Sequence, residues 1–294
     1  MRSEQEMMDL IRGVAKADER IRAVYMNGSR TNPHVAKDPY RDYDVVYVVT
    51  ETAAFFADKG WIAVFGEPAM IQEPDSNDLG WGIGHDPDRS YTWLMLFQDG
   101  NRIDLHIETV DAALERYGSD TLTLPLLDKD GILPALPPPG DTGYWVQRPD
   151  KPRYDGCCNE FWWCLNNVAK GIVRDQLSYA MRMYTGTVLH ELESMTACYI
   201  GTRTDFSVSV GLGGKYFKKY LSPGQYELYR QVYPDGDYAH FWESLFTACR
   251  LFRDLAREVG SYFGYSYPER DDANMTRYLL GMQEAHQGKK GQSS

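Results

Sequence analysis

The chain reads Met26-Asn27-Gly28-Ser29 and, after a spacer at residues 30–41, Asp42-Tyr43-Asp44-Val45-Val46-Tyr47-Val48-Val49. Residues 42–49 are rich in β-branched and aromatic side chains, which predicts a strand. Side chains at positions i and i+2 of a strand point to the same face, so we expect Asp42 and Asp44 to project together, about 7 Å apart. Aspartate is unfavourable in strands, and two of them here indicate a functional role.

A third carboxylate, Asp104, lies within Arg102-Ile103-Asp104-Leu105-His106-Ile107, which is also predicted to be a strand. A neighbouring strand would bring Asp104 to the other two aspartates. Mg²⁺ binds carboxylate oxygens together with substrate phosphates, so the pattern favours phosphoryl or nucleotidyl transfer. Gly28-Ser29 suits the same chemistry, because glycine lets the backbone approach a triphosphate and serine donates to its oxygens. His106 and Glu108 either tune this site or, as strand ends favour, face solvent.

Composition narrows the class of protein. The chain has 294 residues, 43% hydrophobic and 25% charged, which is typical of a globular protein of two domains. Apolar runs such as residues 91–97 are too short to span a membrane, and the first residues do not resemble a signal peptide, so we expect a cytoplasmic monomer. Residues 1–150 carry 14 Lys and Arg against 26 Asp and Glu, a charge of −12, which disfavours nucleic acid as a partner and favours cations.

The order of predicted elements indicates an α+β fold. A helix at residues 3–17, strands at 21–26 and 42–49, and a hairpin at 91–97 and 101–109 form a small mixed sheet domain. Prolines at 134 and 137–139 interrupt the pattern, and the later apolar residues follow helical spacing. We therefore predict a mixed α and β domain at 1–133, a linker at 134–155, an all-helical C-terminal domain at 156–285 and a disordered tail at 286–294.

Five stretches carry a resemblance to a known family. The Gly28-Ser29 turn with Asp42-Tyr43-Asp44 resembles the signature of the DNA-polymerase-β-like nucleotidyltransferase superfamily. More narrowly, the chain resembles the aminoglycoside 6-adenylyltransferases, which modify streptomycin. The matching stretches are GSRTNP (28–33), RDYDVVYVV (41–49), FQDGNRIDL (97–105), LLDKDG (126–131) and CCNEFWW (157–163).

The resemblance implies transfer of AMP from Mg-ATP to a streptomycin hydroxyl at the 6-position, with release of pyrophosphate. Asp42 and Asp44 would hold the metal, and Asp104 would either complete the metal site or act as the general base. Gly28, Ser29 and Arg30 would contact the nucleotide phosphates.

The resemblance makes residues 1–133 a nucleotidyltransferase domain, and it implies that the helical domain closes over nucleotide and substrate. Lys170 and Arg174, four residues apart on one helix face, would bind the triphosphate. The cationic drug would meet Asp155, Glu160 and Trp162. Two alternatives stay open: the same chemistry on another acceptor, whether another aminoglycoside, a lincosamide or a macromolecule, and an ATP-binding module without catalytic activity.

Overall fold

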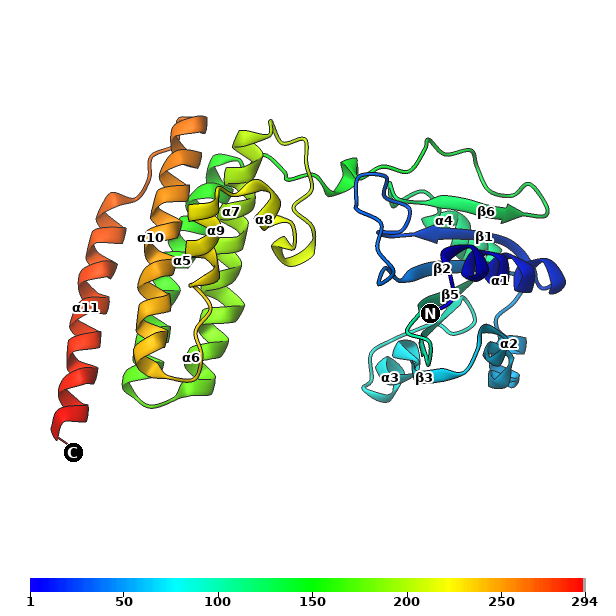
Figure 1. Ribbon diagram of the computed structural model, residues 1–294, viewed down its shortest axis with the longest axis horizontal. Coiled ribbons are helices and arrows are strands. Elements are labelled where there is room, and N and C mark those ends of the chain that lie inside the picture. Colours follow the sequence, from blue (N-terminus) through cyan, green and yellow to red (C-terminus); the bar gives the residue numbers. More distant parts are fainter. Residues whose placement is uncertain (293–294) are drawn as a thin grey trace. The chain divides into compact units, whose positions relative to one another are not determined.

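The computed structural model describes residues 1–292 and divides into two compact units, Met1–Gly143 and Tyr144–Ser294 (Figure 1). The division falls inside the predicted linker at 134–155. The first long helix of the second unit starts at Lys151. No helix among residues 1–292 combines the length and apolar character needed to cross a membrane.

The first unit is a mixed sheet with helices, as the sequence predicts, and the sheet has six strands where the sequence indicated four. The strand order is β3-β4-β5-β2-β1-β6, and every neighbouring pair is antiparallel except β2 and β5, which are parallel. The strands are β1 (Ile21–Asn27), β2 (Tyr43–Val49), β3 (Pro68–Gln72), β4 (Ser90–Phe97), β5 (Arg102–Thr109) and β6 (Leu124–Asp128). The helices are α1 (Glu4–Ala17), α2 (Ala53–Ala57), α3 (Pro74–Gly80) and α4 (Val110–Arg116), with 3-10 turns at Lys59–Phe65 and Thr142–Tyr144.

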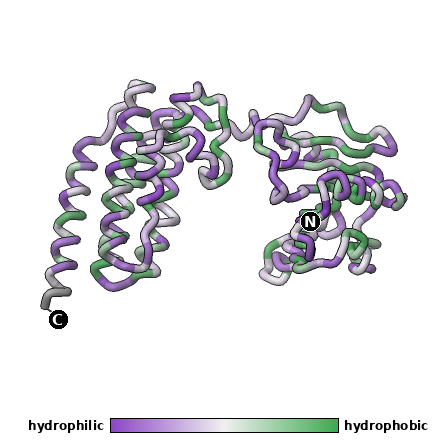
Figure 2. Tube along the Cα trace, in the orientation of Figure 1, coloured by the Kyte–Doolittle hydropathy of each residue, from purple (hydrophilic) through white to green (hydrophobic). Residues whose placement is uncertain are grey.

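Strand alternation separates the two faces of this sheet. Tyr43, Val45 and Tyr47 of β2 pack into the core beneath α1, whereas Val46 and Val48 pack against α4 residues such as Ala113. Helix α1 begins with a capping box, in which the Ser3 side chain and Glu6 satisfy each other's backbone amides. Figure 2 shows the hydrophobic residues gathered along the strands of this unit.

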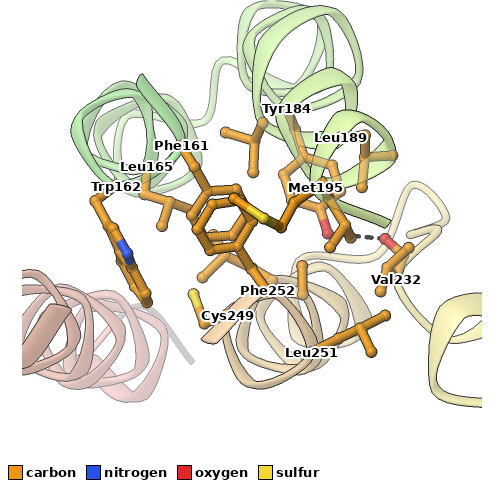
Figure 3. Packing of buried hydrophobic residues seen from close by; sticks show 14 of the residues in the cluster. Phe161, Trp162, Leu165, Tyr184, Leu189, Met195, Val232, Cys249, Leu251 and Phe252 are labelled. Carbon is orange, nitrogen blue, oxygen red and sulfur yellow. Dashed lines mark hydrogen bonds between the residues drawn. The ribbon is translucent and has the colours of Figure 1, made fainter. Parts of the chain in front are cut away.

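The second unit is helical, as predicted, with the bounds α5 (Lys151–Val173), α6 (Leu177–Met183), α7 (Leu189–Arg203), α8 (Phe217–Tyr220), α9 (Pro223–Arg230), α10 (Tyr238–Phe263) and α11 (Glu269–Gln292). A π-helical turn at Tyr184–Val188 joins α6 to α7, and a 3-10 turn lies at Leu212–Gly214. In the core, Phe161 stacks on Phe252 with ring centroids 3.7 Å apart, and the Tyr184 hydroxyl donates to the Val232 carbonyl at 2.8 Å (Figure 3).

The predicted disordered tail from His286 is wrong for residues 286–292, where α11 continues to Gln292. His286 is buried, and its Nδ1 accepts a hydrogen bond from Trp242 Nε1 at 3.4 Å. The polar composition of this segment gave no sign that it packs against another helix. The residues that cover His286, Trp242 and Tyr238, lie on α10, far from it in the sequence. The rest of that prediction, residues 293–294, lies outside the described residues.

Candidate active site

The two central strands bring the predicted carboxylates together. β2 and β5 run in parallel, and their register sets Asp44 opposite Asp104. Asp42 directly precedes β2, and the charges of Asp42 and Asp104 both act on Asp44. Residues far apart in the sequence therefore form one acidic group at the start of two adjacent strands.

This acidic group is electrostatically crowded. The pKa of Asp44 is raised to about 6, mainly by burial and also by the negative charges of Asp104 and Asp42, while Arg102 opposes the shift. The pKa of Asp42 is also raised, mainly by burial. Neighbouring carboxylates that resist ionisation together favour a bound cation, which would relieve their repulsion.

Arg102 supplies a positive charge to this group. Its Nε and Nη2 each donate to a different oxygen of Asp104, both at 2.7 Å, and its Nη1 lies 3.4 Å from Asp42 Oδ2. Within the part of the chain that the structure describes, no set of three or more Asp, Glu, His or Cys side chains is arranged to hold a metal ion. Arg102, two residues before Asp104 on the same face of β5, pairs with Asp104 and approaches Asp42. The roles of Asp42, Asp44 and Asp104 in holding a metal stay a prediction. The i, i+2 spacing of Arg102 and Asp104 is the signal in the sequence for this pair.

Gly28 fits closely against the acidic group. Its φ is +76°, and a Cβ added there would lie 2.2 Å from Asp44 Oδ2. Thr31 closes the turn, because its amide and hydroxyl both donate to the Gly28 carbonyl. Only glycine satisfies both the backbone conformation and the space. Ser29 follows in the same turn, so the structure brings Gly28-Ser29 beside Asp44, as the spacing predicts.

A cavity of about 470 Å³ opens over this group, and it is lined by residues that include Asn27, Gly28, Asp44, Asp104, His106 and Asp120. The cavity continues along β5 past Asp104. It thus offers room for a ligand directly over two of the three aspartates.

The sequence favoured a solvent-facing position for His106 and Glu108 at the end of the strand, and the structure does not show this. Glu108 is only 2% exposed, and it binds Tyr25 Oη at 3.1 Å, Arg116 Nη1 at 2.9 Å and His106 Nε2 at 2.9 Å. Burial would raise the pKa of Glu108, but these partners outweigh it and lower that pKa. Tyr25 from β1 and Arg116 from α4 cover this end of β5, and neither contact is visible in the sequence of the strand.

Arg30 lies away from the cavity that holds Asp44 and Asp104. Its guanidinium carbon is 3.7 Å from the centroid of the Tyr43 ring, Nε donates to the Asp42 carbonyl at 3.2 Å and Nη2 donates to the Arg41 carbonyl. Tyr43 points to the opposite face of β2 from Asp44, and the Arg30 guanidinium packs on the Tyr43 ring at that opposite face. The structure therefore places the Arg30 side chain on the other face of β2 from Asp44, but close enough to Asp42 for its charge to oppose the raised pKa of that carboxyl. Its predicted role on the nucleotide phosphates stays a prediction.

The predicted phosphate-binding residues of the helical domain lie at the end of α5. Lys170 Nζ donates to Asn166 Oδ1 at 2.8 Å, and Arg174, the C-terminal cap of the helix, is exposed. Both belong to the second unit, whereas the aspartates belong to the first.

The predicted acceptor contacts lie earlier on α5. Asp155 is exposed and pairs with Lys151, and Glu160 is exposed and accepts from Cys164 Sγ at 3.3 Å. Trp162 is 2% exposed, and its Nε1 donates to Tyr267 Oη at 3.1 Å. Trp162 is therefore a core residue, although its edge contributes to the lining of a cavity between α5 and α11.

Comparison with known proteins identifies the family. Residues 1–282 match the family described as streptomycin adenylyltransferase. The chain belongs to this family. The streptomycin adenylyltransferase family includes nucleotidyltransferases, so the family resemblance and the enzyme class predicted from the sequence are both confirmed.

Curated relatives match the chain over nearly its whole length. The chain is 36% identical over 283 residues to an aminoglycoside 6-adenylyltransferase of Bacillus subtilis (strain 168), covering 96% of this chain and 98% of the relative. Proteins of the same name from Campylobacter jejuni and Staphylococcus aureus are 34% and 31% identical, over 95% and 94% of this chain and 96% and 98% of their own lengths. A crystal structure of an aminoglycoside 6-adenyltransferase from Bacillus subtilis, 32% identical, covers 96% of this chain and 99% of that chain with a TM-score of 0.47.

Proposed function

We propose that the protein transfers AMP from ATP to a hydroxyl of an aminoglycoside, the 6-position of streptomycin, and releases pyrophosphate. The observation that carries the proposal is the close fit of Gly28 against Asp44, with Asp104 opposite on β5, at the floor of one cavity. A glycine turn beside paired carboxylates suits the phosphates of a nucleotide and their metal. Family membership and the names of the curated relatives support the same reaction.

The donor set suits Mg²⁺. This ion is usually bound by one or two carboxylates together with substrate phosphates, so Asp42 and Asp44 suffice as protein ligands. The acidic group already attracts one cation, the guanidinium of Arg102, which lies beside Asp42 and Asp104. This supports the proposal that it also binds a metal cation. Bound Mg²⁺ would neutralise charge on the phosphates of ATP.

The remaining residues act on the nucleotide and acceptor. The Gly28-Ser29 turn would bind the phosphates, with Lys170 and Arg174 adding positive charge. The acceptor hydroxyl would attack the α-phosphorus, the bond to the β-phosphate would break and pyrophosphate would leave. We assign the hydroxyl proton to Asp104, which the two hydrogen bonds from Arg102 hold in a fixed orientation. Asp155 and Glu160 would face the cationic acceptor, and the burial of Trp162 removes it from this set.

The test is pyrophosphate release from Mg-ATP, measured with and without streptomycin. Asp44→Asn should lower streptomycin-dependent release by at least about a hundredfold, whereas Asp111→Asn, which removes an exposed carboxylate of α4, should not change it. The proposal would be contradicted if pyrophosphate release did not depend on streptomycin, or if the Asp44→Asn variant kept its activity.

A second experiment separates the roles of the aspartates. Asp104→Asn should keep Mn²⁺ binding, measured by calorimetry, while losing transfer, whereas Asp44→Asn should lose both. Loss of Mn²⁺ binding in Asp104→Asn would make Asp104 a metal ligand instead.

A further inference from the structure

A second cavity of about 400 Å³ lies in the first unit, lined by residues that include Arg2, Arg30, Lys37, Arg41 and Tyr43. Tyr43 alternates with Asp44 along β2, so this cavity lies on the opposite face of the strand from the acidic group. The basic lining is unusual for residues 1–150, which carry 14 Lys and Arg against 26 Asp and Glu.

Arg41 is the decisive residue. It is only 8% exposed, and its Nε is buried without a hydrogen-bond partner. Its Nη1 reaches only the Ser29 and Arg30 carbonyls, at 3.4 and 3.5 Å, the long limit for such bonds. Among residues 1–292 no carboxylate forms an ion pair with Arg41. A guanidinium has five N–H donors and always carries its charge, so a buried one with so few acceptors is costly.

Arg30 adds a second buried charge. Its side chain is 4% exposed, and the carboxylate nearest to it, Glu4, lies 3.6 Å from its Nη1. The Arg30 guanidinium also holds the carbonyls of Arg41 and Asp42, so it ties this cavity to the segment that leads into the acidic group.

Two acidic residues, Glu4 and Asp38, also line the cavity, and among the described residues neither forms an ion pair with Arg41. Asp99 is taken up by Arg2, with Nε 2.8 Å from Oδ2, and Asp38 accepts from the Tyr40 amide at 2.8 Å. Lys37 is exposed at the rim. Among the described residues, Arg41 Nε thus has no hydrogen-bond acceptor.

We propose that this cavity binds a phosphate-type oxyanion through Arg41, Arg30 and Lys37. Tetrahedral oxyanions match the fork of N–H donors on arginine, and they are recognised by charge-assisted hydrogen bonds. The anion is either free phosphate or pyrophosphate, or the terminal phosphate of a nucleotide. The site is separate from the proposed adenylyl transfer, because it lies across β2 from Asp44, so either proposal can fail without the other.

The test is calorimetric titration of inorganic phosphate, and then of pyrophosphate, into the full-length protein at constant ionic strength. We expect saturable binding that Arg41→Gln weakens at least about tenfold, as for the loss of a charge-assisted hydrogen bond. Lys37→Ala should weaken it several-fold, and this exposed position keeps the test informative if Arg41→Gln does not fold. The matched control is Lys16→Ala, which removes an exposed charge from α1 outside the cavity.

Asp44→Asn distinguishes the two cavities, since it should leave phosphate binding unchanged. Binding that survives Arg41→Gln and Lys37→Ala but changes in Asp44→Asn would place the anion over the acidic group and overturn the proposal, as would the absence of saturable binding. Competition by ATP without metal identifies the nucleotide as the source of the phosphate, and failure to compete identifies the free anion.

Discussion

Arg102 and Asp104, two residues apart on β5, are joined by two parallel hydrogen bonds of 2.7 Å, and the same guanidinium lies 3.4 Å from Asp42. The pair places a positive charge where the proposed reaction requires a divalent cation and phosphates. Arg102 would therefore compete with the proposed metal for the acidic group in the absence of nucleotide.

Arg102→Ala should tighten Mn²⁺ binding in the absence of nucleotide. The gain should reach about fivefold, equivalent to the roughly 1 kcal/mol that a half-exposed ion pair contributes. Calorimetric titration of Mn²⁺ into both proteins measures it. Arg22→Ala, which breaks the remote pair with Asp130, serves as the control and should leave Mn²⁺ affinity unchanged. Weaker Mn²⁺ binding in Arg102→Ala would show that Arg102 supports the site instead of competing for it.

Gly28→Ala should disrupt the site and lower stability. The new Cβ would lie 2.2 Å from Asp44 Oδ2, and the φ of +76° is unfavourable for alanine by about 1–2 kcal/mol. We expect at least that loss in the free energy of unfolding, measured by urea titration, and loss of AMP transfer. Gly13→Ala on α1 has open space around its Cβ and should stabilise the protein by about 0.5–1 kcal/mol. Equal stability of the two variants would argue against the close contact.

The raised pKa of Asp44 predicts a pH dependence of stability. The folded protein holds the Asp44 proton up to about pH 6, whereas the usual value for aspartate is 3.8, so folding favours the protonated form. Stability should therefore fall as the pH rises from about 4 to above 6. Asp44→Asn removes this term, so its free energy of unfolding should decline less over that interval. Urea titrations of both proteins at several pH values measure the difference, and parallel curves would exclude the raised pKa.

The two adjacent tryptophans of α5 should behave differently. Trp162 is 2% exposed and Trp163 is 65% exposed. Trp162→Ala should lower the free energy of unfolding by about 3–5 kcal/mol because it leaves a cavity in the core. Trp163→Ala should change it by no more than about 0.5 kcal/mol. Thermal or urea unfolding compares the two directly, and similar losses would mean that the helix is rotated from its described orientation.

The buried elements of this fold were predictable from the sequence, and the edge strands were not. β2 and the hairpin of β4 and β5 match their predicted ranges to within one residue, because each of these three strands has a clear apolar pattern in its own sequence. β3 and β6 were missed. They form the two edges of the sheet, each contains a proline, Pro68 or Pro125, and β3 is exposed along its whole length. An edge strand does not need apolar residues on both faces, and the amides on its outer side have no strand to donate to, so proline is tolerated there. It therefore lacks the pattern by which a central strand is recognised.

The site was predictable to the extent that it depends on spacing along the chain. Gly28, Asp42, Asp44 and Asp104 follow a pattern that local sequence carries, and the structure brings them together. The direction of Arg30 and the burial of Trp162 depend on which face of an element packs against its neighbours. The partners of Glu108 come from β1 and α4, and no pattern within β5 announces them.

The parallel pairing of β2 with β5 has a consequence for synthesis on the ribosome. The chain emerges from its N-terminus, and Asp44 leaves the ribosome long before Asp104, its partner in the register. β1 pairs with β2 on one side and with β6 on the other, so its second side stays unpaired until residues 124–128 of β6 have been synthesised. A nascent chain that ends before β5 carries the Gly28-Ser29 turn and two of the three aspartates of the acidic group, but it lacks the β5 residues that line the cavity. Binding of a nucleotide can therefore assist only the last stage of folding of this unit, after its sheet has been completed.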